Sequence, residues 1–386
     1  MKAILLIAVL VSIASSSDLT AQNASTAEPA TTPTPTPLTI PKGVFSLTPA
    51  DKAIARAGVL DNANVDGVTF GIAKPAPAGI MLLTGKLPLG KKDISSIKSK
   101  AFLDGVRIRE DWRRAEPVAG THDWSRIDAA IAVAQSAGRK TGLSVNAGSA
   151  CPDWLFAEGC AYIQMAGSPS PGKLPISNDP HYIARWSQFV AALGARYDSN
   201  PTIAYIIIGG LGDHMEWYYG KDADKAAIVN MFGLANTLAM WTNQAKTFID
   251  AYAAAFPTTA FIGALGSPFT GSASLQAEKD LVTWAVAKYP KRFGLSNSTL
   301  SAKSSTGFYP NAAVNANYLT QPTGFQMLCS ATGDPARFGG TLDQGLSNGV
   351  NLHGRYVEIY SDDVANTALQ PTIISHRTQL LAIPQP

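Results

Sequence analysis

The stretch that decides the fold is residues 105–124, GVRIREDWRRAEPVAGTHDW. It opens with Val106 and Ile108 alternating with charged residues, namely Arg107, Arg109 and Asp111. Successive side chains of a strand point to opposite faces, so one face is predicted to pack under helices. The charged residues are then predicted to point the other way, into the interior of a barrel. Asp-Trp at the end of the stretch opens a helical pattern, which makes the whole stretch one βα unit.

The same strand-then-helix order continues to the end of the chain. Helices are predicted from Asp123 to Gly138, from Asp179-Pro180 onward, and over 236–256 and 275–289. Strands alternating with helices favour parallel pairing, and eight such units close a barrel. We therefore expect a single (β/α)8 TIM barrel over residues 42–386; an open doubly wound sheet would carry a Gly-x-Gly-x-x-Gly turn that is missing after the first strand. The eight predicted strands are 67–73, 105–110, 141–146, 203–208, 260–265, 292–296, 324–328 and 355–360.

The last predicted strand repeats the alternation of the second. Val357 and Ile359 suit the face under the helices, which turns Tyr356, Glu358 and Tyr360 into the barrel. Buried charges are costly unless they are paired, so an arginine strand and a glutamate strand inside one barrel would satisfy each other. Two interpretations stay open: a structural Arg–Glu network, or a carboxylate held by arginine at the catalytic, C-terminal face.

The N-terminal end predicts export. Residues 1–21 have one positive charge at Lys2, a short apolar run and then small residues, as in a secretory signal peptide. Residues 22–41 form a Thr/Pro-rich linker, and we expect a secreted, periplasmic or cell-envelope protein. In that setting Cys151 and Cys160 are expected to form a local disulfide, and Cys329 to be a buried thiol.

Composition narrows the function classes. The 386 residues are 46% hydrophobic and 15% charged, with a net charge of +3 and no basic block, which disfavours nucleic-acid binding. No long apolar window predicts a membrane span in the mature chain. The histidines outside residues 213–216 lack ligand-like spacing, and a Gly-x-Ser-x-Gly elbow is missing, so we expect no metal, no cofactor and no serine nucleophile. The oligomeric state is open.

Three motifs in order carry a family resemblance. They are residues 105–124, then Gly138-Arg139-Lys140 before the third strand, then the Pro-x-Trp-Leu loop at 152–155. Together they resemble the (β/α)8 glycoside hydrolases of the retaining clan that contains the family 42 β-galactosidases and the cellulase-like barrels. The resemblance covers about residues 100–200. It implies a carbohydrate substrate and cleavage of glycosidic bonds by two carboxyl groups.

The resemblance implies which carboxylates act. Glu216, after the fourth strand, matches the clan's acid/base, and Glu358 is the candidate nucleophile, with Tyr360 and Arg109 as partners that would keep it ionised. Met215 stands where the clan has asparagine. The clan's nucleophile lies on the seventh strand, which here carries Gln326. Either the strand count is off by one, the pair has moved, or the barrel binds sugar without hydrolysing it.

Aromatic and amide side chains at predicted strand ends favour sugar binding, because aromatic faces stack on pyranose rings. The open alternatives to an exported retaining glycosidase are a catalytically inactive barrel that binds glycans at the cell envelope, and a tethered structural protein. The predicted substrate-binding residues are Arg109, Asp111, Trp112, Asn146, Trp154, Trp217, Tyr218, Asn297 and Tyr360, and the same rim is expected to hold Tyr162, Tyr219, Phe269 and Tyr309.

Overall fold

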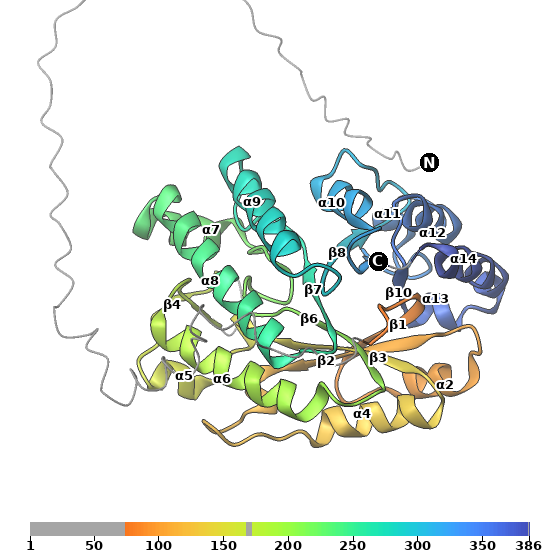
Figure 1. Cartoon of the computed structure of the whole chain (residues 1–386), viewed down its shortest axis with the longest axis horizontal. Helices are drawn as coiled ribbons and strands as arrows, with labels where there is room; N and C mark the ends of the chain where they lie inside the picture. Colours follow the sequence, from red (N-terminus) through yellow and green to blue (C-terminus); the bar gives the residue numbers. More distant parts are fainter. Residues whose placement is uncertain (1–73, 167–171, 385) are drawn as a thin grey trace, which may run out of the picture. The chain divides into compact units, whose positions relative to one another are not determined.

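The computed structural model describes residues 74–166, 172–384 and 386. Within them eight parallel strands close into a barrel in the order β1-β10-β9-β8-β7-β6-β3-β2 (Figure 1). The predicted barrel is therefore confirmed. The predicted signal peptide (1–21) and linker (22–41) lie outside the described residues. The barrel strands are β1 (Gly79–Lys86), β2 (Gly105–Asp111), β3 (Lys140–Asn146), β6 (Ile203–Ile207), β7 (Ala260–Ala264), β8 (Phe293–Leu300), β9 (Thr323–Met327) and β10 (Tyr356–Tyr360).

The first barrel strand is not the predicted one. We expected residues 67–73, which lie outside the described residues, whereas β1 takes that place and pairs with both β10 and β2. Residues 80–83 are all buried, on the helix side and on the barrel side alike. A strand buried on both faces has a continuous apolar run instead of an alternating one, so periodicity does not distinguish it from its surroundings.

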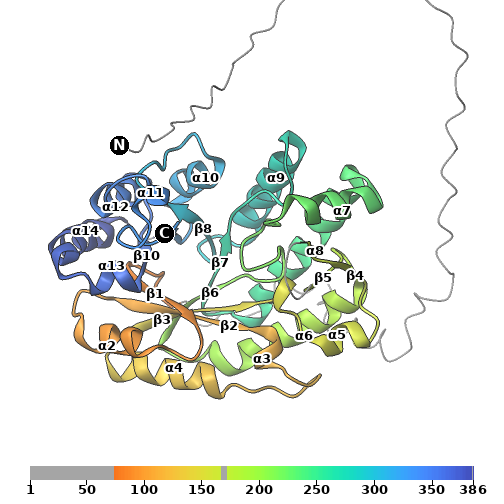
Figure 2. The ribbon, with the colours of Figure 1, turned by 180° about the vertical axis from the view of Figure 1, so that it is seen from behind.

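Helices follow the strands around the barrel, and Figure 2 shows them from behind. Asp179 caps α6 by accepting a hydrogen bond from the Tyr182 amide at 2.9 Å, with Pro180 in the first turn, as the sequence predicts. None of the helices in the described ranges is long and apolar enough to cross a membrane. The α-helices are α2 (Lys91–Ser99), α3 (Trp112–Ala115), α4 (Ser125–Ser136), α5 (Asp153–Ala157), α6 (Pro180–Tyr197), α7 (Asp222–Phe232), α8 (Leu234–Ala255), α9 (Ser272–Lys288), α10 (Tyr309–Asn317), α11 (Pro335–Phe338), α12 (Leu342–Asn351), α13 (Ser361–Ala365) and α14 (Gln370–Ala382).

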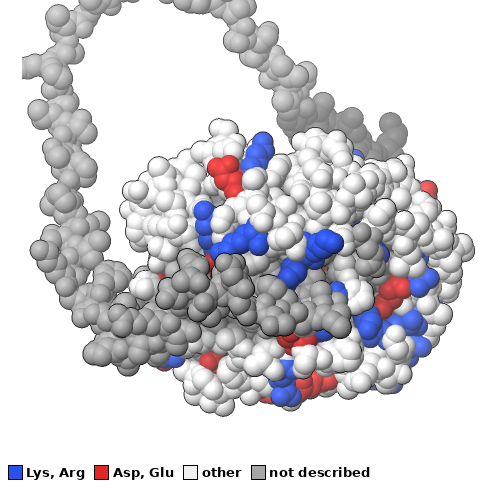
Figure 3. All heavy atoms as spheres, viewed as in Figure 1, with Lys and Arg blue, Asp and Glu red and all other residues white. Residues whose placement is uncertain are grey.

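Short elements complete the chain. An antiparallel pair, β4 (Tyr162–Gln164) and β5 (Lys173–Pro175), lies between α5 and α6, and two 3₁₀ turns span Gly148–Ala150 and Thr367–Leu369. The surface in Figure 3 is largely uncharged, with Lys, Arg, Asp and Glu side chains spread thinly over the face shown.

The barrel has two apolar layers. Val106, Ile108, Val357 and Ile359 pack in the layer between strands and helices, which confirms the predicted alternation of β2 and β10. A second cluster fills the barrel interior and consists of Met81, Ala204, Tyr205, Ile207, Met215, Ala260, Ile262, Ala264 and Tyr356.

Two glycines make room for the interior tyrosines. A Cβ on Gly142 would lie 2.1 Å from the Tyr205 ring, and one on Gly324 would lie 2.1 Å from the Tyr356 ring. The two tyrosine rings pack together with centroids 4.9 Å apart. Small residues opposite large ones allow the Tyr205 hydroxyl to cross the barrel.

Candidate active site

A buried ion pair lies inside the barrel. Arg107 on β2 donates from Nη1 to Oε2 of Glu358 on β10 at 2.7 Å, and both side chains are at most 2% exposed. The same nitrogen donates to Oε1 of Gln326 on β9 at 3.0 Å. Tyr205 on β6 donates its hydroxyl to the other Glu358 oxygen at 2.7 Å. The predicted partners of Glu358 are corrected: Arg107 and Tyr205 hold it, and not Arg109 and Tyr360.

The electrostatics of this network favour the ion pair. Burial works to lower the pKa of Arg107, but the Glu358 carboxylate and two neighbouring tyrosines raise it above its ordinary value. Burial, followed by the Glu358 charge, raises the pKa of Tyr205 well above its usual range, so the phenol keeps its proton and remains a donor. Glu358 thus accepts a hydrogen bond on each of its two carboxyl oxygens.

The strand count places this carboxylate on the eighth strand. β10 is the eighth barrel strand in chain order, and β9, the seventh, carries Gln326 beside Glu358 in register. The proposed error of one in the strand count is therefore excluded.

The loop after β6 carries the second predicted carboxylate. Met215 is 5% exposed, and its sulfur contacts Nη2 of Arg107, so it packs on the ion pair from the C-terminal end. Glu216, the next residue, is partly exposed. Gly212 is needed for this loop to fold, because a Cβ there would lie 2.3 Å from the carbonyl oxygens of both Glu216 and Tyr218.

The charges of both predicted catalytic residues, Glu216 and Glu358, act on the pKa of Arg109. Burial lowers its pKa most, repulsion from Arg107 lowers it further, and the charges of Tyr360, Glu358 and Glu216 act in the opposite direction. Its Nε is buried without a hydrogen-bond acceptor among the described residues. Arg109, Glu216 and Tyr360 therefore share one region at the C-terminal ends of the strands.

The ends of β2 and β3 carry two more predicted binding residues. Asp111 is paired with Lys86 at 2.8 Å and accepts a hydrogen bond from Asn146 at 3.4 Å. Asn146 is 3% exposed, and its Oδ1 is buried with no donor in the described part of the chain. This amide oxygen can accept a hydrogen bond from a ligand hydroxyl.

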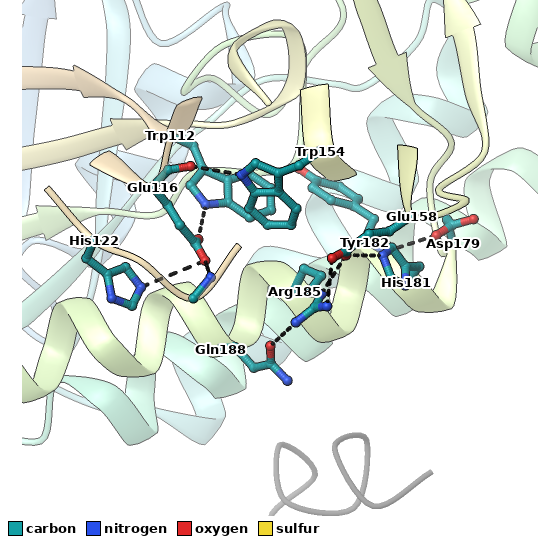
Figure 4. Close-up of polar contacts among 11 residues, drawn as sticks. Trp112, Glu116, His122, Trp154, Glu158, Asp179, His181, Tyr182, Arg185 and Gln188 are labelled. Carbon is teal, nitrogen blue, oxygen red and sulfur yellow. Dashed lines mark hydrogen bonds and ion pairs between the residues drawn. The ribbon is translucent and has the colours of Figure 1, made fainter. Parts of the chain in front are cut away.

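Two of the three tryptophans predicted to bind substrate, Trp112 and Trp217, are buried in the core. Trp112 is fully buried and donates to Glu116 at 2.7 Å (Figure 4). Its ring also packs on Trp186. Trp154 is partly exposed, but its indole donates to the Glu116 carbonyl at 2.9 Å. Trp217 is fully buried against the Phe293 ring. Trp112 and Trp217 thus contribute to the core, with no ring face open to a ligand in this structure.

The remaining predicted binding residues differ in exposure. Tyr218 and Tyr360 are partly exposed near Glu216 and Arg109. Asn297 is buried, donates to Asn311 of α10 at 2.6 Å and accepts from Thr299, so its amide holds the irregular last part of β8.

The predicted disulfide is absent. Cys151 and Cys160 are buried free thiols, as is Cys329. The loop that they flank is closed by other contacts instead: the Cys160 amide donates to the Leu155 carbonyl, and Asp179 accepts from the Ala161 amide at 3.1 Å.

A cavity of about 450 Å³ lies at the opposite end of the barrel. Residues 74–78 and Asp104, Lys140, Pro201 and Leu381 contribute to its lining. These residues precede or begin their strands, whereas enzymatic sites of such barrels lie at the C-terminal ends. The cavity is therefore separate from the candidate active site.

A buried carboxyl outside the predicted site makes folding depend on pH. Burial raises the pKa of Glu278 on α9 from 4.5 to about 7, against the hydrogen bond from Ser267, and its Oε1 lacks a partner within the described residues. The folded chain keeps a proton that the unfolded chain releases above pH 4.5. The free energy of unfolding should therefore decrease by about 3 kcal/mol as pH rises from below 4.5 to above 7.

Chemical denaturation across this pH range measures the effect. Glu278→Gln should remove most of this part of the pH dependence, whereas Asp280→Asn, on the exposed side of the same helix, should leave it in place. An unchanged pH dependence in Glu278→Gln contradicts the assignment.

Comparisons with known proteins agree with the family resemblance. Residues 90–226 match the family model Glyco_hydro_42, described as beta-galactosidase. This confirms the predicted resemblance and supports a glycosidase. No curated protein matches the chain.

Solved structures match the chain at low sequence identity. The catalytic domain of beta-amylase from Paenibacillus polymyxa matches with a TM-score of 0.50 and 12% identity, over 79% of this chain and 99% of that one. A beta-galactosidase from the psychrophilic Marinomonas ef1 gives 0.47 and 10%, over 78% and 59%. The intracellular xylanase TsXylA from Thermoanaerobacterium saccharolyticum gives 0.45 and 13%, over 73% and 85%. The beta-amylase match shows a common fold.

Proposed function

We propose that this chain cleaves O-glycosidic bonds in an oligo- or polysaccharide by a retaining mechanism, with Glu216 as the acid/base and Glu358 as the nucleophile. The observation that carries the proposal is the carboxyl group of Glu358 inside the barrel, which accepts hydrogen bonds from Arg107 and Tyr205, with the partly exposed Glu216 on the loop after β6. Residues 1–21 add the proposal that the protein is exported.

The two carboxyl groups have different surroundings, as the two roles require. Arg107 and Tyr205 favour an ionised Glu358, which can attack the anomeric carbon and form a glycosyl ester. Glu216, partly exposed, gives its proton to the departing glycosidic oxygen. In the second half, Glu216 takes a proton from water, the water oxygen bonds to the anomeric carbon, and the ester bond to Glu358 breaks.

Access to Glu358 requires a movement of the loop that carries Glu216. Glu358 is 0% exposed, and Met215 packs on its Arg107 partner. A sugar can reach the carboxylate only when Met215 leaves the barrel interior. Since Met215 and Glu216 are consecutive, the same movement positions the acid.

The stereochemistry of hydrolysis tests the proposal. Proton NMR of the first product formed from a panel of aryl glycosides and oligosaccharides should show the anomer of the substrate. The opposite anomer contradicts Glu358 as a nucleophile, because inversion needs a base and a water molecule in its place.

A second candidate function is a barrel that binds glycans without cleaving them. Gln326 on the seventh strand and the complete burial of Glu358 favour it, since both fit a structural network. This function predicts saturable glycan binding with no turnover of any substrate in the panel.

A further inference from the structure

Arg109 is the one inward-facing charge of β2 without a partner in the described part of the chain. Arg107 is paired with Glu358, and Asp111 with Lys86. The Arg109 side chain forms neither a hydrogen bond nor an ion pair with any described residue, and its Nε is buried. A guanidinium carries five donors, and leaving donors unpaired inside a protein costs free energy.

A second guanidinium approaches the same region from the loop after β9. Arg337, in α11, is exposed, and its side chain has no ion pair among the described residues. Burial raises the pKa of Tyr360, while Arg109 and Arg337 both act to lower it, so the phenol has a guanidinium within electrostatic range from each of two elements. Glu358 already accepts two hydrogen bonds, whereas the Glu216 side chain has neither a hydrogen bond nor an ion pair among the described residues.

We propose that the substrate is an acidic glycan and that Arg109 binds the carboxylate of a uronic acid unit at the mouth of the barrel. This rests on the proposed function, because it concerns the sugar that enters the same site. A carboxylate fits the planar fork of a guanidinium with two parallel hydrogen bonds. It would satisfy the buried donor of Arg109. It would also bring a negative charge to the region of two cations, Arg109 and Arg337, when Glu216 carries the proton of an acid.

Ligands that differ only in the charge of the carboxylate measure its contribution to binding. Oligosaccharides of galacturonate and of glucuronate are compared with their methyl esters, which keep the ring stereochemistry and lose only the charge. Titration calorimetry with the full chain should show at least one acid binding about ten- to a hundredfold more tightly than its ester. Arg109→Gln should remove that preference, and Arg109→Lys, which keeps the charge, should restore part of it.

The control removes a positive charge from the helix layer. Arg196, paired with Asp128 on the outer surface, is replaced by glutamine, and the preference for the acid should stay. Equal binding of acid and ester by the wild type, or no binding of either, overturns the proposal. Tighter binding of a sulfated oligosaccharide than of either uronate overturns the carboxylate assignment, and an equal loss for acid and ester in Arg109→Gln reveals a merely structural arginine.

These outcomes separate this inference from hydrolysis. If no substrate is cleaved but acids bind more tightly than esters, the proposed glycosidase mechanism fails and the inference stands. If neutral glycosides are cleaved with retention and acids have no advantage, the reverse holds.

Discussion

Replacing Glu216 with glutamine should lower kcat by about 10²- to 10⁴-fold on substrates with a sugar leaving group, because the amide cannot protonate the departing oxygen. Glutamine keeps the size of the side chain, so the loop and the buried Met215 next to it should stay in place. KM should change little for sugar leaving groups. It should fall for activated aryl glycosides, because the glycosyl ester accumulates when Glu216 cannot take a proton from water. Aryl glycosides with acidic phenols should lose less in the first step, since such leaving groups depart without a proton.

The values of kcat/KM, which report the first step, measure this contrast on a paired set of aryl and sugar leaving groups. Glu158→Gln is the matched control, because Glu158 lies in an outer network with His181 and Arg185 (Figure 4). It should retain kcat within about twofold, since its side chain contacts neither Glu216 nor Glu358. A loss of less than tenfold in Glu216→Gln, equal for both kinds of leaving group, would falsify the role of Glu216 as the acid.

Alternation in the sequence predicted the parts of the site that depend on local geometry alone. The two-residue period of β2 and β10 turned Arg107 and Glu358 inward, and the ion pair between them follows from the cost of an unpaired buried charge. The same period in β6 turns Tyr205 inward, where its hydroxyl donates to Glu358.

The alternation does not predict which inward side chains form pairs across the barrel. Which of two inward arginines reaches Glu358 depends on the relative shift of strands that are about 250 residues apart, and the structure selects Arg107 over Arg109. Aromatic residues show a similar limit. Trp112 and Trp217 do follow strand ends, but whether a ring turns to the mouth or under the helices depends on packing partners such as Trp186 and Phe293.

Replacing Arg107 with methionine should lower the free energy of unfolding by about 3–5 kcal/mol, because it leaves the Glu358 carboxylate buried with a single hydrogen bond from Tyr205. Gln326 also loses the donor to its side-chain oxygen. Denaturant unfolding of the full chain measures the change. The control is Lys225→Met, which breaks an ion pair with the exposed Asp222 and should cost less than about 1 kcal/mol.

A second substitution shows whether charge or packing causes the loss. In Arg107→Met with Glu358→Gln, no charge of the pair remains, so much of the lost stability should return, although the double variant still lacks a carboxylate. If Arg107→Met alone costs less than about 1 kcal/mol, water reaches Glu358 in solution and the carboxylate is not enclosed. If the double variant is as unstable as the single one, the guanidinium stabilises the barrel by filling space against Met215 rather than by neutralising Glu358.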